Sequence, residues 1–217
     1  MKKHPYFFLL LLICSFSCKR DPAPAPDFIF PLPQVLSDYG YFVKGTYWIY
    51  QDSTTKVIDS VYVINNEQGT KETSPQRGSP YNGYFGYYDV YIQSSFEGMQ
   101  YHEWVNTETS SGGHTVIWED KSNGSGSVGQ TFLMTDYFVP GQTFLTGGYT
   151  TVVYENKFDS LKILNINFKN VIVFHDGNNA TQNNSPTNFY LSKKIGVIRK
   201  EIFASNKVWN LIRYHIQ

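Results

Sequence analysis

Short apolar runs with a period of two recur along the chain and are separated by turn-forming residues. The alternation is clearest in residues 46–51, 57–64 and 87–92, and similar runs follow at 101–107, 114–119, 131–135, 150–154, 161–168, 171–175, 195–203 and 208–216. Such alternation places one set of side chains on each face of a β-strand. The connectors are short and polar, for example 52–56, 169–170 and 204–207, which favours hairpins between sequential strands. The sequence therefore predicts an antiparallel meander of about ten strands.

The shape of this sheet follows from the need to cover its edges and its apolar faces. Closing the meander removes the edges, so we predict an all-β fold, either an up-and-down (lipocalin-like) barrel or a strongly curved sheet. A two-sheet β-sandwich is the alternative, and strand patterns do not separate the two. No run has sustained helical periodicity, which argues against nucleotide-binding α/β folds. The 17 Tyr and 16 Phe suit strands, because aromatic rings pack well on a pleated surface.

The N-terminus carries an export signal. Lys2 and Lys3 precede a short apolar run at 6–13, a pattern typical of a signal peptide, which we assign to residues 1–17. The tetrapeptide Ser-Phe-Ser-Cys at 15–18 resembles a bacterial lipobox, in which the cysteine thiol receives lipid. The two cysteines of the chain are both in this region, so disulfides in the body are not expected. An ordinary cleaved signal with an incidental Cys18 is the alternative.

Lipid on Cys18 would hold the mature chain at a membrane, because each buried methylene adds roughly 0.8 kcal/mol of binding. We expect an outer-membrane lipoprotein of the cell envelope, with the periplasmic or surface face left open. Five prolines between residues 22 and 33 predict an extended spacer, so residues 18–40 are assigned to the lipidated cysteine and its tether. Residues 41–217 have the length of a single β domain.

Charge and motifs exclude several classes of partner. The formal net charge is zero, so nothing attracts nucleic acid. Residues 124–129 match the G-x-G-x-x-G pattern, but a strand follows the motif where dinucleotide binding needs one before it and a helix after it. No cofactor is therefore expected. The oxygen-rich segment 176–184 lacks the alternating carboxylates of a calcium loop, and we interpret it as solvated.

Catalytic and metal sites have weak support in the sequence. The histidines of the predicted mature chain lack the close same-face spacing of a metal pair, and they are His102, His114, His175 and His215. Two carboxylates for glycoside hydrolysis could come from Asp89, Glu103, Glu119 and Asp120, but sequence does not supply their separation. Without a serine elbow or a zinc-protease motif, we expect no metal site and no enzyme, with a hydrolase kept as an alternative.

Two similarities bear on how the chain is organised. Tyr-Phe-Val-Lys-Gly at 41–45 recurs as Tyr-Phe-Val-Pro-Gly at 137–141, and Asp-Ser follows each, at 59–60 and 159–160; duplication and coincidence both stay open. Residues 45–50 with 59–61, and 195–202 with 209–214, resemble the first and last hairpins of small uncharacterised Bacteroidota lipoproteins. That resemblance implies the same fold and location and carries no known activity.

The aromatic segment 81–91 is the strongest candidate binding feature. Tyrosines flanked by glycines give rigid, amphipathic platforms for sugars or partner proteins, and the candidates are Tyr81, Tyr84, Tyr87, Tyr88 and Tyr91. The alternative is that these rings only pack within the core and on its outer face. We therefore expect a non-catalytic binding or envelope-assembly module for a glycan, a lipid or an envelope protein, or else a structural accessory subunit of an outer-membrane complex.

Overall fold

The computed structural model describes residues 28–72, 83–95, 100–106, 115–120, 129–135, 139–141, 143–146, 150–176, 186–203 and 205–217. The predicted signal peptide, Cys18 and the first part of the tether lie outside these residues. Within them, the chain forms a single 13-stranded sheet and one short helix. The elements are β1 Phe28–Phe30, α2 Gln34–Gly40, β2 Tyr47–Asp52, β3 Ile58–Glu72, β4 Gly83–Ser94, β5 Gln100–Asn106, β6 Thr115–Asp120, β7 Gly129–Thr135, β8 Thr143–Thr146, β9 Thr150–Ile163, β10 Ile166–Asp176, β11 Thr187–Ser192, β12 Gly196–Ile202 and β13 Lys207–His215.

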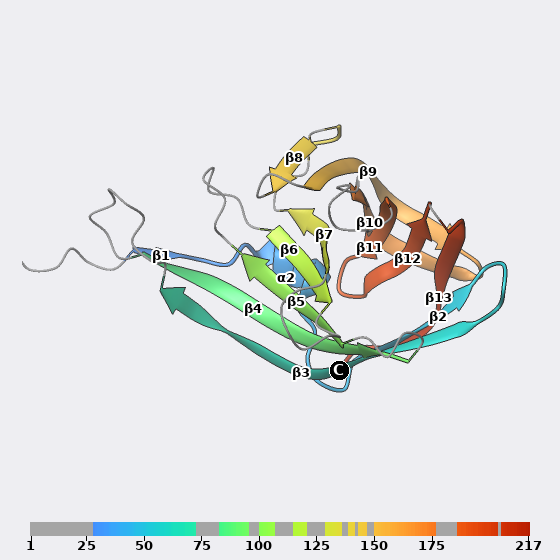
Figure 1. The fold of residues 1–217 in the computed structure, drawn as a ribbon, viewed down its shortest axis with the longest axis horizontal. Coiled ribbons are helices and arrows are strands. Elements are labelled where there is room, and N and C mark those ends of the chain that lie inside the picture. The colour runs from blue at the N-terminus through green and yellow to red at the C-terminus, as the bar shows by residue number, and fades with distance from the viewer. Residues whose placement is uncertain are drawn as a thin grey trace, which may run out of the picture.

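The strands follow one another as an up-and-down meander. From β2 to β7, and again from β8 to β13, each strand pairs antiparallel with the next, and β13 then pairs with β2 (Figure 1). The path ends at β7 and β8, with no ladder between these two strands in the described part of the chain. The all-β prediction of a meander in a strongly curved sheet is confirmed, and the described strands belong to one sheet rather than to a two-sheet sandwich.

The sequence misplaced the breaks around the β9–β10 hairpin, because the gap between the predicted runs 150–154 and 161–168 lies inside β9. The predicted connector 169–170 lies inside β10, and the chain instead turns at Leu164 and Asn165, between the paired residues Ile163 and Ile166. Leu164 is exposed and has a φ of 53°. Apolar alternation runs straight through this turn, so the pattern concealed it. Asn170 looked like a turn residue, but its carbonyl accepts hydrogen bonds from Tyr39 and Lys193.

Helix α2 occupies residues that we expected in the tether. It lies inside the curve of the sheet (Figure 1), and Leu36 and Tyr39 are buried in the core. The Tyr88 hydroxyl donates to the Leu36 carbonyl at 3.2 Å. The body of the protein therefore begins before residue 41. The reason is packing, because a seven-residue helix has little stability of its own and forms where an apolar face is covered.

Two aromatic side chains of β2 reach past β13 to β12 and the turn before it. Trp48 of β2 donates its indole N–H to the Ile195 carbonyl at 2.6 Å, and the Tyr50 hydroxyl donates to the Val197 carbonyl at 2.7 Å. The ladder between β12 and β13 covers Arg199 to Ile202, so both acceptors lie outside it. Side-chain donors thus satisfy backbone carbonyls that the ladder does not reach, and buried polar groups need such partners.

Part of the sequence repeat corresponds to a repeated structure. Gly45 and Gly141 both have a positive φ, of 98° and 77°, which favours glycine. Their N–H groups donate to the carbonyls of Val63 and Tyr154, on the second strand of the hairpins β2–β3 and β8–β9. The first ladder includes Tyr47 opposite Tyr62, and the second includes Thr143 opposite Val153. In each hairpin this pair joins the second residue after the glycine to the residue just before the accepting carbonyl. The Asp-Ser pairs are not equivalent, because 59–60 precedes Val63 whereas 159–160 follows Tyr154.

Alkaline pH is expected to destabilise the fold through Tyr39. Burial, with smaller effects from Asp38 and Tyr154, raises the pKa of Tyr39 from 10.0 to about 12. The fold has its full stability below pH 10, where the phenol is neutral in both the folded and the unfolded chain. As pH rises from 10 to 12 the unfolded chain loses this proton first, and the free energy of unfolding falls by at most roughly 2–3 kcal/mol. Urea unfolding at pH 9 and pH 11 measures the loss, and Tyr39→Phe should flatten it. Equal pH slopes for the two proteins would contradict this assignment.

Candidate functional site

The five predicted tyrosines do not form one platform. Tyr81 lies outside the described residues, as does the side chain of Tyr84, whose backbone belongs to β4. Tyr88 has no exposed surface and belongs to the core. Tyr87 and Tyr91 are half-buried, and strand alternation places them on the face opposite Tyr88. Tyr88 is therefore a structural residue, and Tyr87 and Tyr91 are the described members that a surface ligand can reach.

One exposed carboxylate, that of Glu67, lies beside Tyr91 on this surface. The Tyr91 hydroxyl is 3.5 Å from Oε1 of Glu67, and Glu67 is the cross-strand partner of Asp89. Burial and the negative charges of Asp89 and Glu67 raise the pKa of Tyr91. Tyr87 packs over Gly69, where an added Cβ would lie 3.3 Å from its ring. Asp89 itself is buried, so this surface offers the two phenol rings and one exposed carboxylate, that of Glu67.

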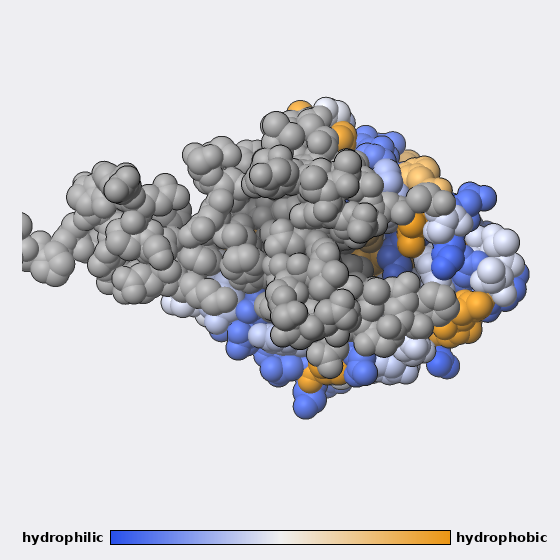
Figure 2. Space-filling view, in the orientation of Figure 1, coloured by the Kyte–Doolittle hydropathy of each residue, from blue (hydrophilic) through white to orange (hydrophobic). Residues whose placement is uncertain are grey.

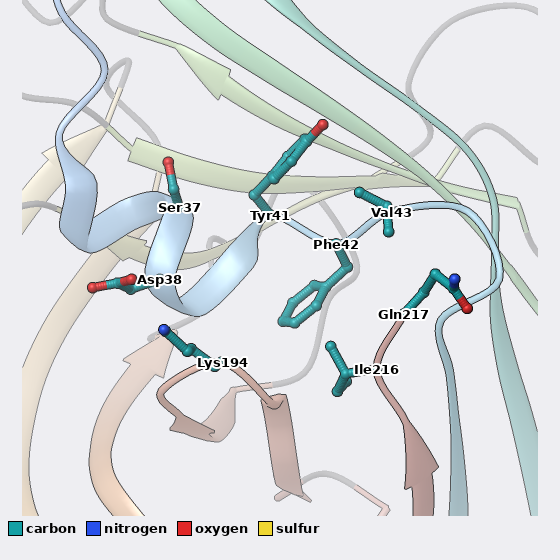
Figure 3. Close-up of a pocket in the computed structure, with 8 residues that line it drawn as sticks. All are labelled: Ser37, Asp38, Tyr41, Phe42, Val43, Lys194, Ile216 and Gln217. Atoms are coloured by element: carbon teal, nitrogen blue, oxygen red, sulfur yellow. The ribbon is translucent and has the colours of Figure 1, made fainter.

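A pocket of about 300 Å³ lies beside α2, where three segments that are distant in the sequence meet (Figure 3). Helix α2 contributes Ser37 and Asp38, the segment after it contributes 41–43, the β11–β12 turn contributes Lys194, and the chain end contributes 216–217. Such a volume is at the lower end of small-ligand sites. The site is concave and mixed in polarity, with Phe42 directed toward Ile216 at its centre and Gln217 at one side (Figure 3).

Hydrogen bonds from backbone N–H groups hold these segments in place. The N–H of Lys194 donates to the Asp38 carbonyl at 2.6 Å, which fixes the β11–β12 turn against α2. The N–H of Gln217 donates to the Thr46 hydroxyl, which is itself fully buried, at 3.2 Å. At Gly196, an added Cβ would lie 3.0 Å from the Phe42 ring. The pocket wall is thus preformed, because its backbone is fixed independently of any ligand.

The aromatic side of the pocket is rigid. Phe42 is buried and packs edge-on against Trp48, with ring centroids 4.9 Å apart. The ring centroids of Tyr41 and Tyr88 are 5.4 Å apart. The Tyr41 hydroxyl accepts a hydrogen bond from Nδ2 of Asn66 at 2.9 Å. Fixed rings lose little entropy when a ligand packs on them, so they favour binding.

The charges around the pocket are unequally compensated. The Asp38 carboxylate lies 2.8 Å from Nζ of Lys193 and accepts a hydrogen bond from Gln34 at 3.3 Å. Lys194 is exposed and has no ion-pair partner within the residues that the structure describes. Among the charged side chains that the structure describes around the pocket, the uncompensated one is therefore positive.

A polar network that the sequence did not reveal covers the outer face of β10–β12. The carboxylate of Glu201 is its centre. Nε of Arg199 donates to Oε1 of Glu201, and Nη2 of Arg199 lies 2.6 Å from the same oxygen. Tyr190 and Asn188 donate to the other oxygen, Oε2. Burial and the Glu201 charge raise the pKa of Tyr190. A carboxylate accepts hydrogen bonds and does not donate them, so Glu201 orients every group around it.

The network also fixes the proton of His175. Because Nδ2 of Asn188 faces Glu201, its Oδ1 faces Nδ1 of His175, at 2.7 Å. Nδ1 must then carry the hydrogen, and Nε2 of a neutral ring is left as the acceptor. Arg199 also lies over the Tyr190 ring at 5.6 Å. His175 is therefore held in the network by Asn188.

The remaining candidates that the structure describes do not assemble into a site. His215 stacks on Tyr47 with centroids 5.7 Å apart, and Asp176 is buried. His114 and residues 121–128 and 177–185 lie outside the described residues, as do the side chains of His102, Glu103, Glu119 and Asp120. Across the described residues, no group of three or more His, Cys, Asp or Glu is placed to bind a metal ion. None of the helical residues described forms a stretch long and apolar enough to cross a membrane.

Comparisons with protein-family models, curated proteins and solved structures found no match to this chain.

Proposed function

We propose that this chain is a membrane-anchored, non-catalytic binding module that holds a glycan in the pocket beside α2. The observation that carries the proposal is the composition of the pocket. Phe42, Val43 and Ile216 supply an apolar wall, and Ser37 and Gln217 supply hydrogen-bonding groups next to it. Sugar rings present an apolar face and a rim of hydroxyls, so a small site with both kinds of wall suits them.

The other two ligand classes fit the described surfaces less well. An acyl chain needs a long apolar cavity, whereas the inside of the sheet is filled by Leu36, Tyr39 and the aromatic core. An envelope protein needs a broad apolar patch. On the face in Figure 2, hydrophobic residues of the described part form small separate patches among polar ones. Exposed Tyr62 and Ile64 on β3 are the feature that favours the alternative of an accessory subunit in an outer-membrane complex.

The anchor in this proposal is lipid on Cys18, and the proline-rich residues 21–27 are the spacer. Support comes from the basic and apolar leader and from the lipobox-like residues 15–18. A non-catalytic role is consistent with the pocket, where one carboxylate, Asp38, is already paired with Lys193. Tethering would keep a weak single-site module close to envelope polysaccharides, where local concentration compensates for modest affinity.

Filling the pocket tests the proposal. The full chain, purified in detergent micelles, is titrated with neutral and acidic monosaccharides, and binding is followed by saturation-transfer NMR. Ser37→Tyr places a ring in the pocket and should weaken binding at least about tenfold, because the ligand then meets a clash. Ser53→Tyr, on the exposed β2–β3 turn, is the matched control and should bind normally. Unchanged binding by Ser37→Tyr, or no binding of any sugar by the native chain, would refute the site.

A further inference from the structure

The charge distribution of the pocket narrows the class of ligand. Asp38 and Lys194 are the charged side chains among the lining residues, and Lys193 is the charged neighbour that faces Asp38. The Asp38 side chain is 15% exposed and lies 2.8 Å from Nζ of Lys193. Its charge is therefore largely neutralised before any ligand arrives.

Lys194 is held at the pocket by its backbone. Its φ of 62° belongs to the left-handed region, and its N–H is fixed to the Asp38 carbonyl. The side chain itself is exposed and makes no ion pair within the described part of the chain. An ammonium group that is anchored at its base and free at its tip can bind an incoming anion without first breaking another contact.

We propose that the pocket selects an acidic sugar, of the size of one hexuronic acid, whose carboxylate binds Nζ of Lys194. This rests on the proposed function, since it names the ligand class of the same site. The ring of the sugar packs on Phe42 and Ile216, and its hydroxyls reach Ser37 and Gln217, which lie around the same cavity (Figure 3). Lys193 assists by keeping the Asp38 carboxylate from repelling the ligand.

Matched pairs of sugars separate this inference from the broader proposal. D-glucuronate and D-glucose, and D-galacturonate and D-galactose, are titrated into the full chain in detergent micelles by isothermal calorimetry or by NMR. We expect each acid to bind roughly fivefold or more tightly than its neutral partner, since a charge-assisted hydrogen bond is about twice as strong as a neutral one. The preference should shrink at high salt, which screens the ion pair.

Three variants assign the preference to its charges. Lys194→Gln should bring acid and neutral sugar to equal affinity, whereas Asp38→Asn should strengthen binding of the acid. Lys193→Gln should weaken it, because the Asp38 charge is then uncompensated. Lys157→Gln, at an exposed lysine on β9, is the control and should change nothing. Equal binding of acid and neutral sugars by the native chain would overturn the acidic-sugar inference alone. Failure of every sugar to bind would overturn this inference and the proposed function together.

Discussion

Replacing Leu36 with alanine is expected to lower the free energy of unfolding by about 3 kcal/mol. Leu36 has no exposed surface, and truncation of a fully buried leucine leaves a cavity that costs about 2–5 kcal/mol. The effect is large here because α2 has only seven residues and depends on this contact for its position. Alanine retains the main-chain carbonyl of residue 36, which accepts the hydrogen bond from the Tyr88 hydroxyl, so the cost comes from lost packing.

The measurement is urea unfolding of the full chain, followed by tryptophan fluorescence. Val35→Ala is the matched control, since Val35 is the preceding helical residue and is only half-buried. It should cost less than about 1.5 kcal/mol, in proportion to the smaller area removed from water. If Leu36→Ala and Val35→Ala had equally small effects, residues 34–40 would belong to the tether after all.

Gly86→Ala is the second substitution with a large expected cost, about 2–3 kcal/mol. An added Cβ would lie 2.7 Å from the backbone nitrogen of Leu32 and 3.1 Å from its Cβ. Because the nearer atom belongs to the backbone, the segment between β1 and α2 has to move, and overpacking of this kind costs about 1–3 kcal/mol. Glycine-to-alanine changes at unstrained positions gain only about 0.4–1 kcal/mol from the unfolded state.

Gly69→Ala, on the neighbouring strand β3, provides the comparison. Its Cβ would lie 3.3 Å from the Tyr87 ring, and a half-buried ring shifts more easily than a backbone atom. We expect a change below about 1 kcal/mol there, measured by the same urea unfolding. A Gly86→Ala protein as stable as the native chain would mean that the segment before α2 does not pack against β4.

Much of the sheet could be predicted because each strand carries its own evidence. Period two in runs such as 46–51 and 87–92 identifies strands without knowledge of their partners. The helix at 34–40 was missed because Leu36, Tyr39 and Gly40 span little more than one turn, and Pro31 and Pro33 next to them suggested a spacer. Tertiary packing, which the local sequence does not encode, decides such short elements.

The pocket and the Glu201 network differ in how far they were predictable. Asn188 and Tyr190 alternate with buried residues on β11, which is typical of a strand with one polar face, whereas Arg199 and Glu201 lie in a half of β12 that shows no such alternation. That the four would converge on one carboxylate depends on register, which the pattern alone does not give. The pocket had no sequence signal, because Ser37, Lys194 and Gln217 come together only when the last strand of the meander pairs with the first.

The most direct test of a ligand site beside α2 is to map the contact surface residue by residue. Amide NMR spectra of the full chain in detergent micelles are recorded while D-glucuronate is added. The proposed site predicts shifts concentrated at the amides of Ser37, Val43, Lys194 and Gln217, with the β9–β10 turn at Leu164 unchanged. Shifts concentrated at Tyr87 and Tyr91, or no shifts at all, would contradict it.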